Sequence, residues 1–285
     1  MNAIERWKAA LAAWAIPDEI LAAAPESPWG FPSELFARRT ASALQRPLTE
    51  SHRRSLEALP VGGTMLDVGV GGGAGSLPLA SRLSQITGVD TSEKMLDSFR
   101  MAAEDAGIRV ATVLGEWPAV AGEVPGCDVA VCHHVLFNVA DLKPFVVALS
   151  ARARRRVVIE MTPEHPLSWM NDLWLTFHGL GRPSSPTYKD AAEAIADLGF
   201  HVHSMLSQGP PVVSGFPNRG DAIAFVRKRL CLWPEDDARL AQALGDRLVE
   251  KEGLWSAAPP NHPIVSLWWD QSGGYPPTTP QNPET

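Results

Sequence analysis

The sequence lacks the excess of basic residues that a protein needs to hold nucleic acid on a broad charged face. Its 285 residues include 25 Lys and Arg against 32 Asp and Glu, which gives a formal net charge of −7 at pH 7. Because neutralisation of phosphates by basic side chains supplies most of the affinity for nucleic acid, we expect no nucleic-acid partner. A small molecule is the better expectation for a ligand.

Cysteine is scarce, and no hydrophobic run is long. The three cysteines, Cys127, Cys132 and Cys231, form no Cys-x-x-Cys pair, so they indicate no disulfide framework. No apolar run approaches the roughly 18 residues that a membrane span needs. The short apolar run at residues 9–16 lies between acidic residues, unlike a signal peptide. We therefore expect a cytoplasmic protein in a reducing compartment, with no membrane association.

The texture of the chain changes near residue 60. Before it, Ile4, Trp7, Leu11 and Trp14 recur at helical spacing, and after it short β-branched runs alternate with helix-length segments. This organisation predicts three parts. They are a helical cap over residues 1–59, a domain over 60–232 with an insertion at 163–186 beside the site, and a C-terminal helix with a disordered tail over 233–285.

The alternation predicts a doubly wound α/β fold with helices on both faces of a sheet. We expect seven strands, at residues 64–69, 86–90, 110–114, 128–132, 156–161, 200–205 and 222–228. We expect helices at residues 74–83, 92–106, 142–151, 169–178, 189–198 and 236–248, besides helical stretches at residues 4–14 and 35–44.

A glycine-rich run lies between the first strand and the following helix. Residues 66–73 read Leu-Asp-Val-Gly-Val-Gly-Gly-Gly, and the spaced glycines are Gly69, Gly71 and Gly73. Glycines let the backbone turn sharply and admit a nucleotide-type ligand against bare amide groups. Asp67, two residues earlier, would repel a pyrophosphate but attract a cationic ligand. Asp90 closes the second strand, where a carboxylate can accept both ribose hydroxyls.

Together these residues resemble the class I S-adenosylmethionine-dependent methyltransferases, over about residues 60–230. The resemblance implies a Rossmann-like, mostly parallel seven-stranded sheet with an antiparallel last strand, and S-adenosyl-L-methionine as the cofactor. It implies that Asp90 binds the ribose and that the next helix opens at Thr91, with Met95 against the adenine unless Met95 is an ordinary core residue. Glu116 stands where the family often has an acid, and Trp117 is expected to stack on the base.

Two adjacent histidines follow the fourth strand. The carboxyl ends of parallel strands line the ligand crevice, so His133 and His134 should lie near the transferred methyl group. An imidazole suits a general base for a hydroxyl acceptor; the alternative for each is a histidine that bonds a backbone carbonyl. Successive side chains alternate, so one is expected to face the crevice. We favour His134 as the base, and keep His133 as a second catalytic candidate and a cofactor contact.

The acceptor is expected to be a small, largely apolar molecule that is methylated on oxygen or nitrogen, under a cover of the N-terminal helices and the insertion at 163–186. Aromatic residues suited to its pocket, unless they belong to the core, are Trp29, Phe31, Trp117, Trp169 and Trp174. His201 and His203 share one strand face but lack a third ligand at a convincing spacing. We therefore expect no metal.

Two other interpretations stay open. The spacing Gly69-x-Gly71-x-x-Ala74 also satisfies the dinucleotide fingerprint, so the chain can be read as an NAD-dependent oxidoreductase. The same fold also serves proteins that bind a cofactor without catalysis. The sequence makes no prediction of the oligomeric state.

Overall fold

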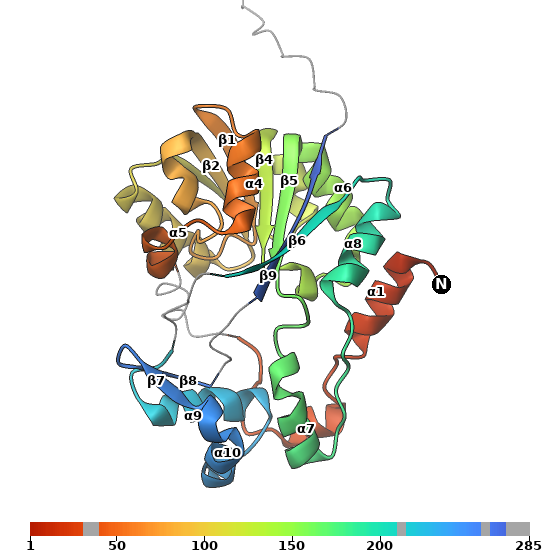
Figure 1. The fold of residues 1–285 in the computed structure, drawn as a ribbon, viewed down its shortest axis with the longest axis vertical. Coiled ribbons are helices and arrows are strands. Elements are labelled where there is room, and N and C mark those ends of the chain that lie inside the picture. Colours follow the sequence, from red (N-terminus) through yellow and green to blue (C-terminus); the bar gives the residue numbers. More distant parts are fainter. Residues whose placement is uncertain (31–39, 210–214, 258–262, 272–285) are drawn as a thin grey trace, which may run out of the picture.

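A mixed sheet forms the centre of the computed structural model, which describes residues 1–30, 40–209, 215–257 and 263–271. Its strand order is β3-β2-β1-β4-β5-β9-β6 (Figure 1). The strands are β1 (Gly63–Val68), β2 (Leu83–Asp90), β3 (Val110–Leu114), β4 (Cys127–His133), β5 (Ala153–Met161), β6 (His203–Gln208) and β9 (Pro263–Asp270). The first five pair in parallel, whereas β9 runs antiparallel to both β5 and β6. The predicted Rossmann-like sheet with an antiparallel last strand is confirmed.

Alternation along the strands divides the apolar side chains between two cores. Leu66 and Val68 of β1 pack in one core and Met65 in the other, because neighbouring side chains of a strand point to opposite faces. Helices cover both faces, as predicted. The Met65 face carries α4 (Glu50–Ala58) and α5 (Glu93–Asp105), and the opposite face carries α1 (Ala3–Ala12), α6 (Leu142–Arg152) and α8 (Tyr188–Ala196).

The expected α-helix at residues 74–83 is wrong. The glycine-rich run continues instead into a short 3₁₀ helix, η1 (Leu77–Arg82). Gly73 and Gly75 are poor helix formers, and Pro78 has no amide hydrogen to donate, so this segment cannot sustain an α-helix. The other 3₁₀ helices are η2 (Ala119–Glu123), η3 (Leu136–Asn138), η4 (Ser168–Met170), η5 (Pro234–Asp236) and η6 (Gly245–Arg247).

The seventh strand also lies elsewhere than predicted. Residues 222–228, expected to be a strand, belong to helix α9 (Arg219–Arg229). Asn218 caps this helix by accepting the amide of Asp221 through its side chain at 2.8 Å. The antiparallel strand is β9, so the sheet runs past residue 232, where we expected the domain to end. The tail predicted to be disordered, residues 273–285, lies outside the described residues.

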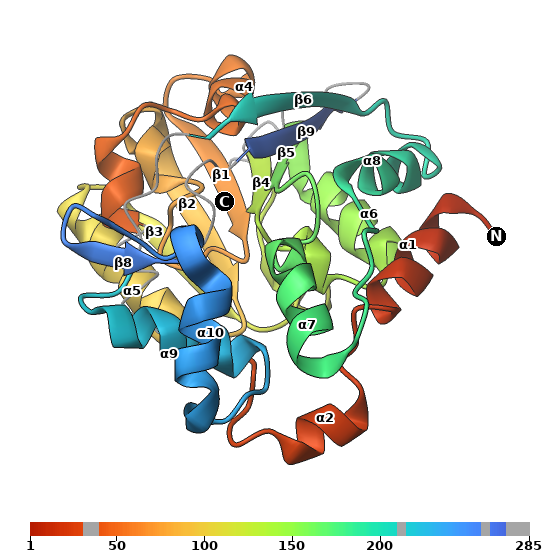
Figure 2. The ribbon, with the colours of Figure 1, turned by 60° about the horizontal axis from the view of Figure 1, so that its bottom comes forward.

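A second, smaller core holds a helical subdomain together. It contains Leu173 and Trp174 from the insertion, Val226 and Leu240 from the region after β6, and Ile16 from the N-terminal segment. Figure 1 places this subdomain beyond the end of the sheet to which β5 leads, and Figure 2 brings it forward. Its elements are α2 (Asp18–Ala23), α7 (Asn171–His178), α9, α10 (Asp237–Leu244), β7 (Val249–Lys251) and β8 (Leu254–Ser256).

The N-terminal helices are present but do not act as one cap. Helix α1 packs against α8, α4 lies on the sheet, and α2 joins the helical subdomain. Residues 40–45 are helical, and the rest of the helix expected at 35–44 lies outside the described residues. Within the described ranges, no helix has the length and apolar character to cross a bilayer.

Candidate functional site

The glycine loop after β1 is built for close approach. Gly69, Gly71 and Gly73 have φ values of 72°, 51° and 91°, a region that residues with a Cβ rarely adopt. A Cβ at Gly69 would lie 2.3 Å from Val135, and one at Gly73 would lie 2.6 Å from Leu77, so packing forbids side chains there. A Cβ at Gly71 would have no described atom within 4 Å. A ligand can therefore reach the backbone at Gly71.

Asp90 is held at the mouth of this loop. Its Oδ2 accepts the amide of Gly71 at 2.9 Å, and its Oδ1 accepts the amide of Ser92 at 3.0 Å. The carboxylate is thus fixed at the carboxyl end of β2, beside the open position of the loop. This is the geometry expected of a group that binds ribose hydroxyls.

Asp67 is a buried acid without a cation. It is 1% exposed, and its Oδ2 has no hydrogen-bond partner among the described residues. Burial raises the pKa of Asp67 from 3.8 to about 7, because the charged form is poorly solvated there. A Cβ at Gly75 would lie 3.3 Å from this oxygen, so the loop wraps around the carboxyl group. A cationic ligand near the loop would favour the ionised acid.

Three polar side chains gather on the same face of the sheet. The alternation that puts Met65, Val129 and Val158 in one core also directs Asp67, His133 and Glu160 to that face, at the carboxyl ends of β1, β4 and β5. Glu160 was not among the site residues predicted from the sequence. The available signal was an acid at the end of an otherwise apolar run, Val-Val-Ile-Glu-Met at residues 157–161.

His134 forms a dyad with Glu160. Its Nε2 lies 3.2 Å from Oε1 of Glu160, and its amide donates to the backbone oxygen of Glu160 at 2.7 Å. The His134 side chain is 53% exposed, and its φ of 59° is a left-handed conformation that is uncommon outside glycine. His134 therefore lies at the accessible edge of the sheet, as a general base requires, with Glu160 behind it.

Glu160 is buried but ionised. Its Oε2 accepts the hydroxyl of Thr49 at 2.8 Å. Burial by itself raises the pKa of Glu160, but the neighbouring imidazoles of His133 and His134 lower it, and the net shift is below the ordinary value. The carboxylate can therefore orient the exposed imidazole and stabilise it once it carries a proton.

His133 occupies a different environment from His134. Its side chain is 9% exposed, its Nδ1 is 3.9 Å from Oε1 of Glu160, and its Nε2 has no partner among the described residues. Burial lowers the pKa of His133 to about 4, so the ring is neutral at pH 7. A Cβ at Gly75 would lie 3.1 Å from this ring, which places His133 against the glycine loop rather than at the accessible edge.

His52 ties helix α4 to the loop, a role that the sequence did not reveal. Its Nδ1 accepts the amide of Thr49 at 3.1 Å, so Nε2 carries the proton and donates to the oxygen of Ala74 at 3.2 Å. Burial lowers the pKa of His52, which keeps it in this neutral form. This contact could have been predicted only if α4 had first been placed next to the glycine loop.

The other predicted cofactor contacts differ from one another in how far they are exposed. Thr91 and Glu116 are exposed, and Met95 is half-buried on α5. Trp117 is 6% exposed within the core of the opposite face, and its indole nitrogen donates to the oxygen of Phe145 at 3.1 Å. Trp117 is therefore a core residue, and little of the indole surface is left to stack on a base.

An aromatic cavity of about 390 Å³ begins where β4 ends. Phe137 and Asn138 of η3 form one side, the end of α1 and Trp14 another, and His165, Trp174 and Arg182 of the insertion a third. Of the aromatic residues expected at the acceptor, Trp29 and Trp174 line this cavity, Trp169 packs beside the subdomain core, and Phe31 lies outside the described residues.

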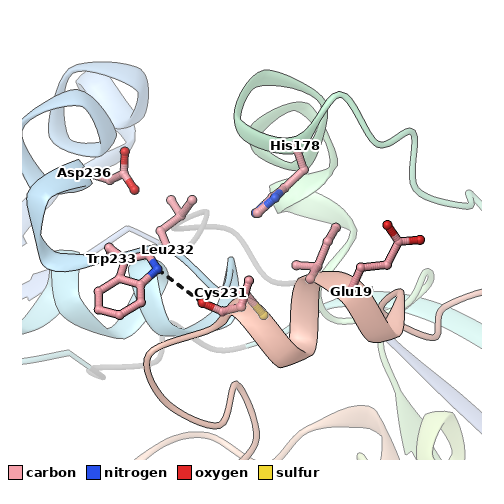
Figure 3. A pocket seen from close by; sticks show the side chains of 8 residues that line it. Glu19, His178, Cys231, Leu232, Trp233 and Asp236 are labelled. Carbon is pink, nitrogen blue, oxygen red and sulfur yellow. Dashed lines mark hydrogen bonds between the residues drawn. The ribbon is translucent and has the colours of Figure 1, made fainter.

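A second cavity, of about 320 Å³, lies within the helical subdomain (Figure 3). Its lining comes from α2, the end of α7 and residues 231–236, with Glu19, His178 and Asp236 among them. His178 already bonds the oxygen of Leu230 at 2.6 Å, and Trp233 donates to the oxygen of Ala23 at 3.2 Å. No lining residue comes from the sheet, so this cavity is separate from the glycine loop.

Metal ligands do not gather in the described part of the chain. The rings of His201 and His203 lie 4.8 Å apart, but no group of three His, Cys, Asp or Glu side chains that could hold an ion occurs among the described residues.

Comparisons with known proteins agree with this geometry. Residues 65–155 match the sequence model of the methyltransferase domain family. The ubiquinone biosynthesis O-methyltransferase of Bordetella parapertussis is 34% identical over 112 residues, 38% of this chain and 46% of that protein. The enzyme of the same name from Idiomarina loihiensis is 30% identical over 129 residues, 42% of this chain and 51% of that protein. The match thus spans about half of the length of these relatives.

The fold agrees with that of a solved structure. A cyclopropane-fatty-acyl-phospholipid synthase-like protein from Lactobacillus casei superposes with a TM-score of 0.52 at 16% identity, over 88% of this chain and 98% of that one. The match at residues 65–155 includes the glycine loop and Asp90, the residues that carried the resemblance. The domain match at residues 65–155, the strand order and the loop together show that the sheet domain of this chain is similar to the class I S-adenosylmethionine-dependent methyltransferases.

Proposed function

We propose that the chain transfers a methyl group from S-adenosylmethionine to an oxygen or nitrogen of a small molecule. The observation that carries the proposal is the open backbone at Gly71, which Asp90 bonds, in a loop that also wraps around the buried carboxyl group of Asp67. Asp90 is positioned for ribose hydroxyls, and Asp67 supplies negative potential where a cationic ligand end would lie. Both acids suit a nucleoside that carries positive charge.

The same charges argue against a dinucleotide. A pyrophosphate binds where backbone amides meet a positive helix end, and it is repelled by a nearby carboxylate. Here the amide of Gly71 is already engaged by Asp90, and the α-helix that would follow the loop is absent. An NAD-dependent oxidoreductase is therefore the poorer fit to this loop.

When bound, the cofactor supplies an electrophilic methyl group on a sulfonium. His134 would accept the proton that a hydroxyl acceptor loses as its oxygen bonds the methyl carbon and the sulfur keeps the electron pair of the broken bond. Its Nε2 faces Glu160, so Nδ1 is the nitrogen available to the acceptor. Glu160 would hold the ring and stabilise the imidazolium. A catalytically silent binding protein would not need such a dyad.

The acceptor site fits the aromatic cavity beside η3. It is close in the chain to the dyad, since Phe137 follows His134 by three residues, and α1 and the insertion form two of its sides. An apolar enclosure excludes water from a displacement at carbon. The names of the relatives describe O-methylation, which favours oxygen over nitrogen as the methylated atom. The three cysteines are buried free thiols, which suits the cytoplasmic location that we propose.

Calorimetric titration with S-adenosylhomocysteine and with NAD tests the proposal. We expect S-adenosylhomocysteine to bind and NAD not to bind. Asp90→Asn should weaken the nucleoside, whereas Asp97→Asn, an exposed acid of α5 paired with Arg100, should leave the dissociation constant unchanged. Binding of NAD without S-adenosylhomocysteine would refute the proposed function, and binding of the nucleoside without any methyl transfer would favour the non-catalytic alternative.

A further inference from the structure

The aromatic cavity beside η3 is lined by basic side chains, and none of the described residues of its lining is Asp or Glu. We propose that it binds a flat aromatic or alicyclic molecule bearing one carboxylate or a similar anionic group. The assignment of this cavity as the acceptor site rests on the proposed function. The chemistry of its ligand follows from the lining residues alone.

The walls are suited to a flat ring. His165 stacks on Trp14 with ring centroids 3.8 Å apart, and Phe137 meets His165 edge to face at 5.4 Å. Trp29 and Trp174 complete the aromatic lining. The volume of about 390 Å³ lies at the lower end of the range for small-molecule sites, which is roughly 300–1,000 Å³. One or two fused rings with a substituent are an appropriate size.

The charge in these walls is positive. Arg182 lies over the rings of Trp14 and Trp174, 5.4 Å and 5.0 Å from their centroids, Arg229 also lines the cavity, and Lys8 stands at the rim. Asn138 is a neutral polar residue of the lining, and none of the described lining residues is Asp or Glu. Among the described residues, no carboxylate forms an ion pair with Arg182 or Lys8. The described part of the lining is therefore positively charged, and it contains no acid that balances Arg182 or Lys8.

Burial makes this charge costly, and an anion would offset the cost. Desolvation lowers the pKa of Arg182, and burial together with the charge of Arg182 lowers the pKa of His165 to about 4, so His165 is neutral at pH 7. The ring of His165 accepts the amide of Leu167 at Nδ1, which leaves Nε2–H as a donor. A cation, aromatic faces and a neutral donor together complement an aromatic anion better than a neutral or cationic ligand.

A structural role for Arg182 is the competing explanation. Its guanidinium donates to the oxygens of Trp14 and Ala15, so it also fastens the chain after α1 to the insertion. A fastening role requires the hydrogen bonds alone and predicts no preference among ligands. A recognition role predicts that charge on the ligand matters. Ligand pairs that differ only in charge separate the two roles.

The test uses 2-naphthoate and its uncharged analogue 2-naphthalenemethanol, titrated calorimetrically into the full chain at low ionic strength and pH 7. We expect the carboxylate to bind at least about tenfold more tightly than the alcohol, because a partly desolvated ion pair is stronger than a neutral contact. The preference should shrink at high salt. Equal affinities, or no binding of either probe, would overturn the proposal.

Variants locate the effect. Arg182→Gln should remove most of the preference for the carboxylate, and Arg182→Lys should retain more of it. Arg239→Gln is the matched control, since Arg239 also stacks on a ring, that of Phe177, and donates to a backbone oxygen, but does not line the cavity. Lys8→Gln, at an exposed position, should reduce the preference by a few-fold without endangering the fold.

The experiments distinguish failure of the ligand proposal from failure of the proposed function. If Arg182→Gln leaves the preference unchanged, the carboxylate binds elsewhere and the proposal is wrong. If Arg182→Gln does not fold, the comparison of the two probes in the unaltered protein and in Lys8→Gln still decides. Failure of S-adenosylhomocysteine to bind, measured in the same calorimeter, would refute the proposed function while leaving the ligand chemistry of the cavity to be judged on the naphthalene pair.

Discussion

The buried acid Asp67 makes a quantitative prediction for stability against pH. Its pKa of about 7 in the folded chain compares with 3.8 for an exposed aspartic acid. Between these values the folded state holds a proton that the unfolded state has lost, so the free energy of unfolding falls as pH rises and levels off above pH 7. The slope is about 1.4 kcal/mol per pH unit and flattens near pH 7, so Asp67 destabilises the protein by about 2 kcal/mol between pH 5 and pH 7.

Asp67→Asn removes this dependence because an amide does not ionise in this range. We expect the difference in unfolding free energy between Asp67→Asn and the unaltered protein to shift by about 3 kcal/mol in favour of the variant from pH 5 to pH 8. Urea titrations at each pH, followed by circular dichroism and by tryptophan fluorescence, measure it. The comparison concerns the change with pH, so any constant cost of the amide cancels.

Asp97→Asn is the matched control, since Asp97 is exposed on α5. Its difference from the unaltered protein should stay flat within about 0.5 kcal/mol. A flat difference for Asp67→Asn as well would show that Asp67 is an ordinary ionised acid and would refute the reasoning. If Asp67 does serve a cationic ligand, binding of S-adenosylmethionine below pH 7 should also release a proton, detected by titration in buffers of different ionisation enthalpy, and Asp67→Asn should abolish the release.

Three further predictions concern the loop and the dyad. Asp90→Ala should raise the dissociation constant of S-adenosylhomocysteine by about 10- to 100-fold in calorimetry, because two hydroxyls lose a charged acceptor; an unchanged constant would mean that another acid binds the ribose. His134→Asn should lower the turnover of a hydroxyl acceptor by about 10²- to 10⁴-fold in initial-rate assays and leave nucleoside affinity within a few-fold; full activity would leave alignment as the main catalytic device. Thr49→Ala should destabilise the protein at pH 7 by about 1.5–3 kcal/mol more than Thr187→Ala. Both substitutions remove a helix cap, but only Thr49 also bonds the buried Glu160. Equal losses of unfolding free energy in urea would contradict the Glu160 contact.

The first five strands and the cofactor loop could be predicted because their signals are local. Each strand is a short apolar run bounded by turn residues, and the loop with Asp67 and Asp90 lies within about one βαβ unit. The prediction of the last strand at residues 222–228 was wrong because the pattern of a capped helix was interpreted as β alternation. Asn218 followed three residues later by Asp221, just before an apolar run, is a helix start, and that signal outweighs the short run of β-branched and aromatic residues after it.

The acid behind His134 could not be predicted in the same way, because its partners are distant in the chain. Thr49 and Glu160 are 111 residues apart in sequence, and helix α4 contacts β5 only through the tertiary fold. Strand parity alone would have brought Asp67, His133 and Glu160 to one face, had the strands first been placed side by side. Parity would also have sent His134 to the opposite face, away from Glu160.

The left-handed backbone of His134 explains why it escapes that rule, and it also decides how the residue must be tested. With φ at 59°, the chain turns at the end of β4, and the ring comes back to within 3.2 Å of Glu160. Asparagine adopts this conformation readily and offers no base, so His134→Asn removes the imidazole and keeps the turn. A β-branched residue such as valine would add strain of about 1–3 kcal/mol. Activity lost in His134→Val but kept in His134→Asn would therefore report the backbone turn and not proton transfer by the imidazole.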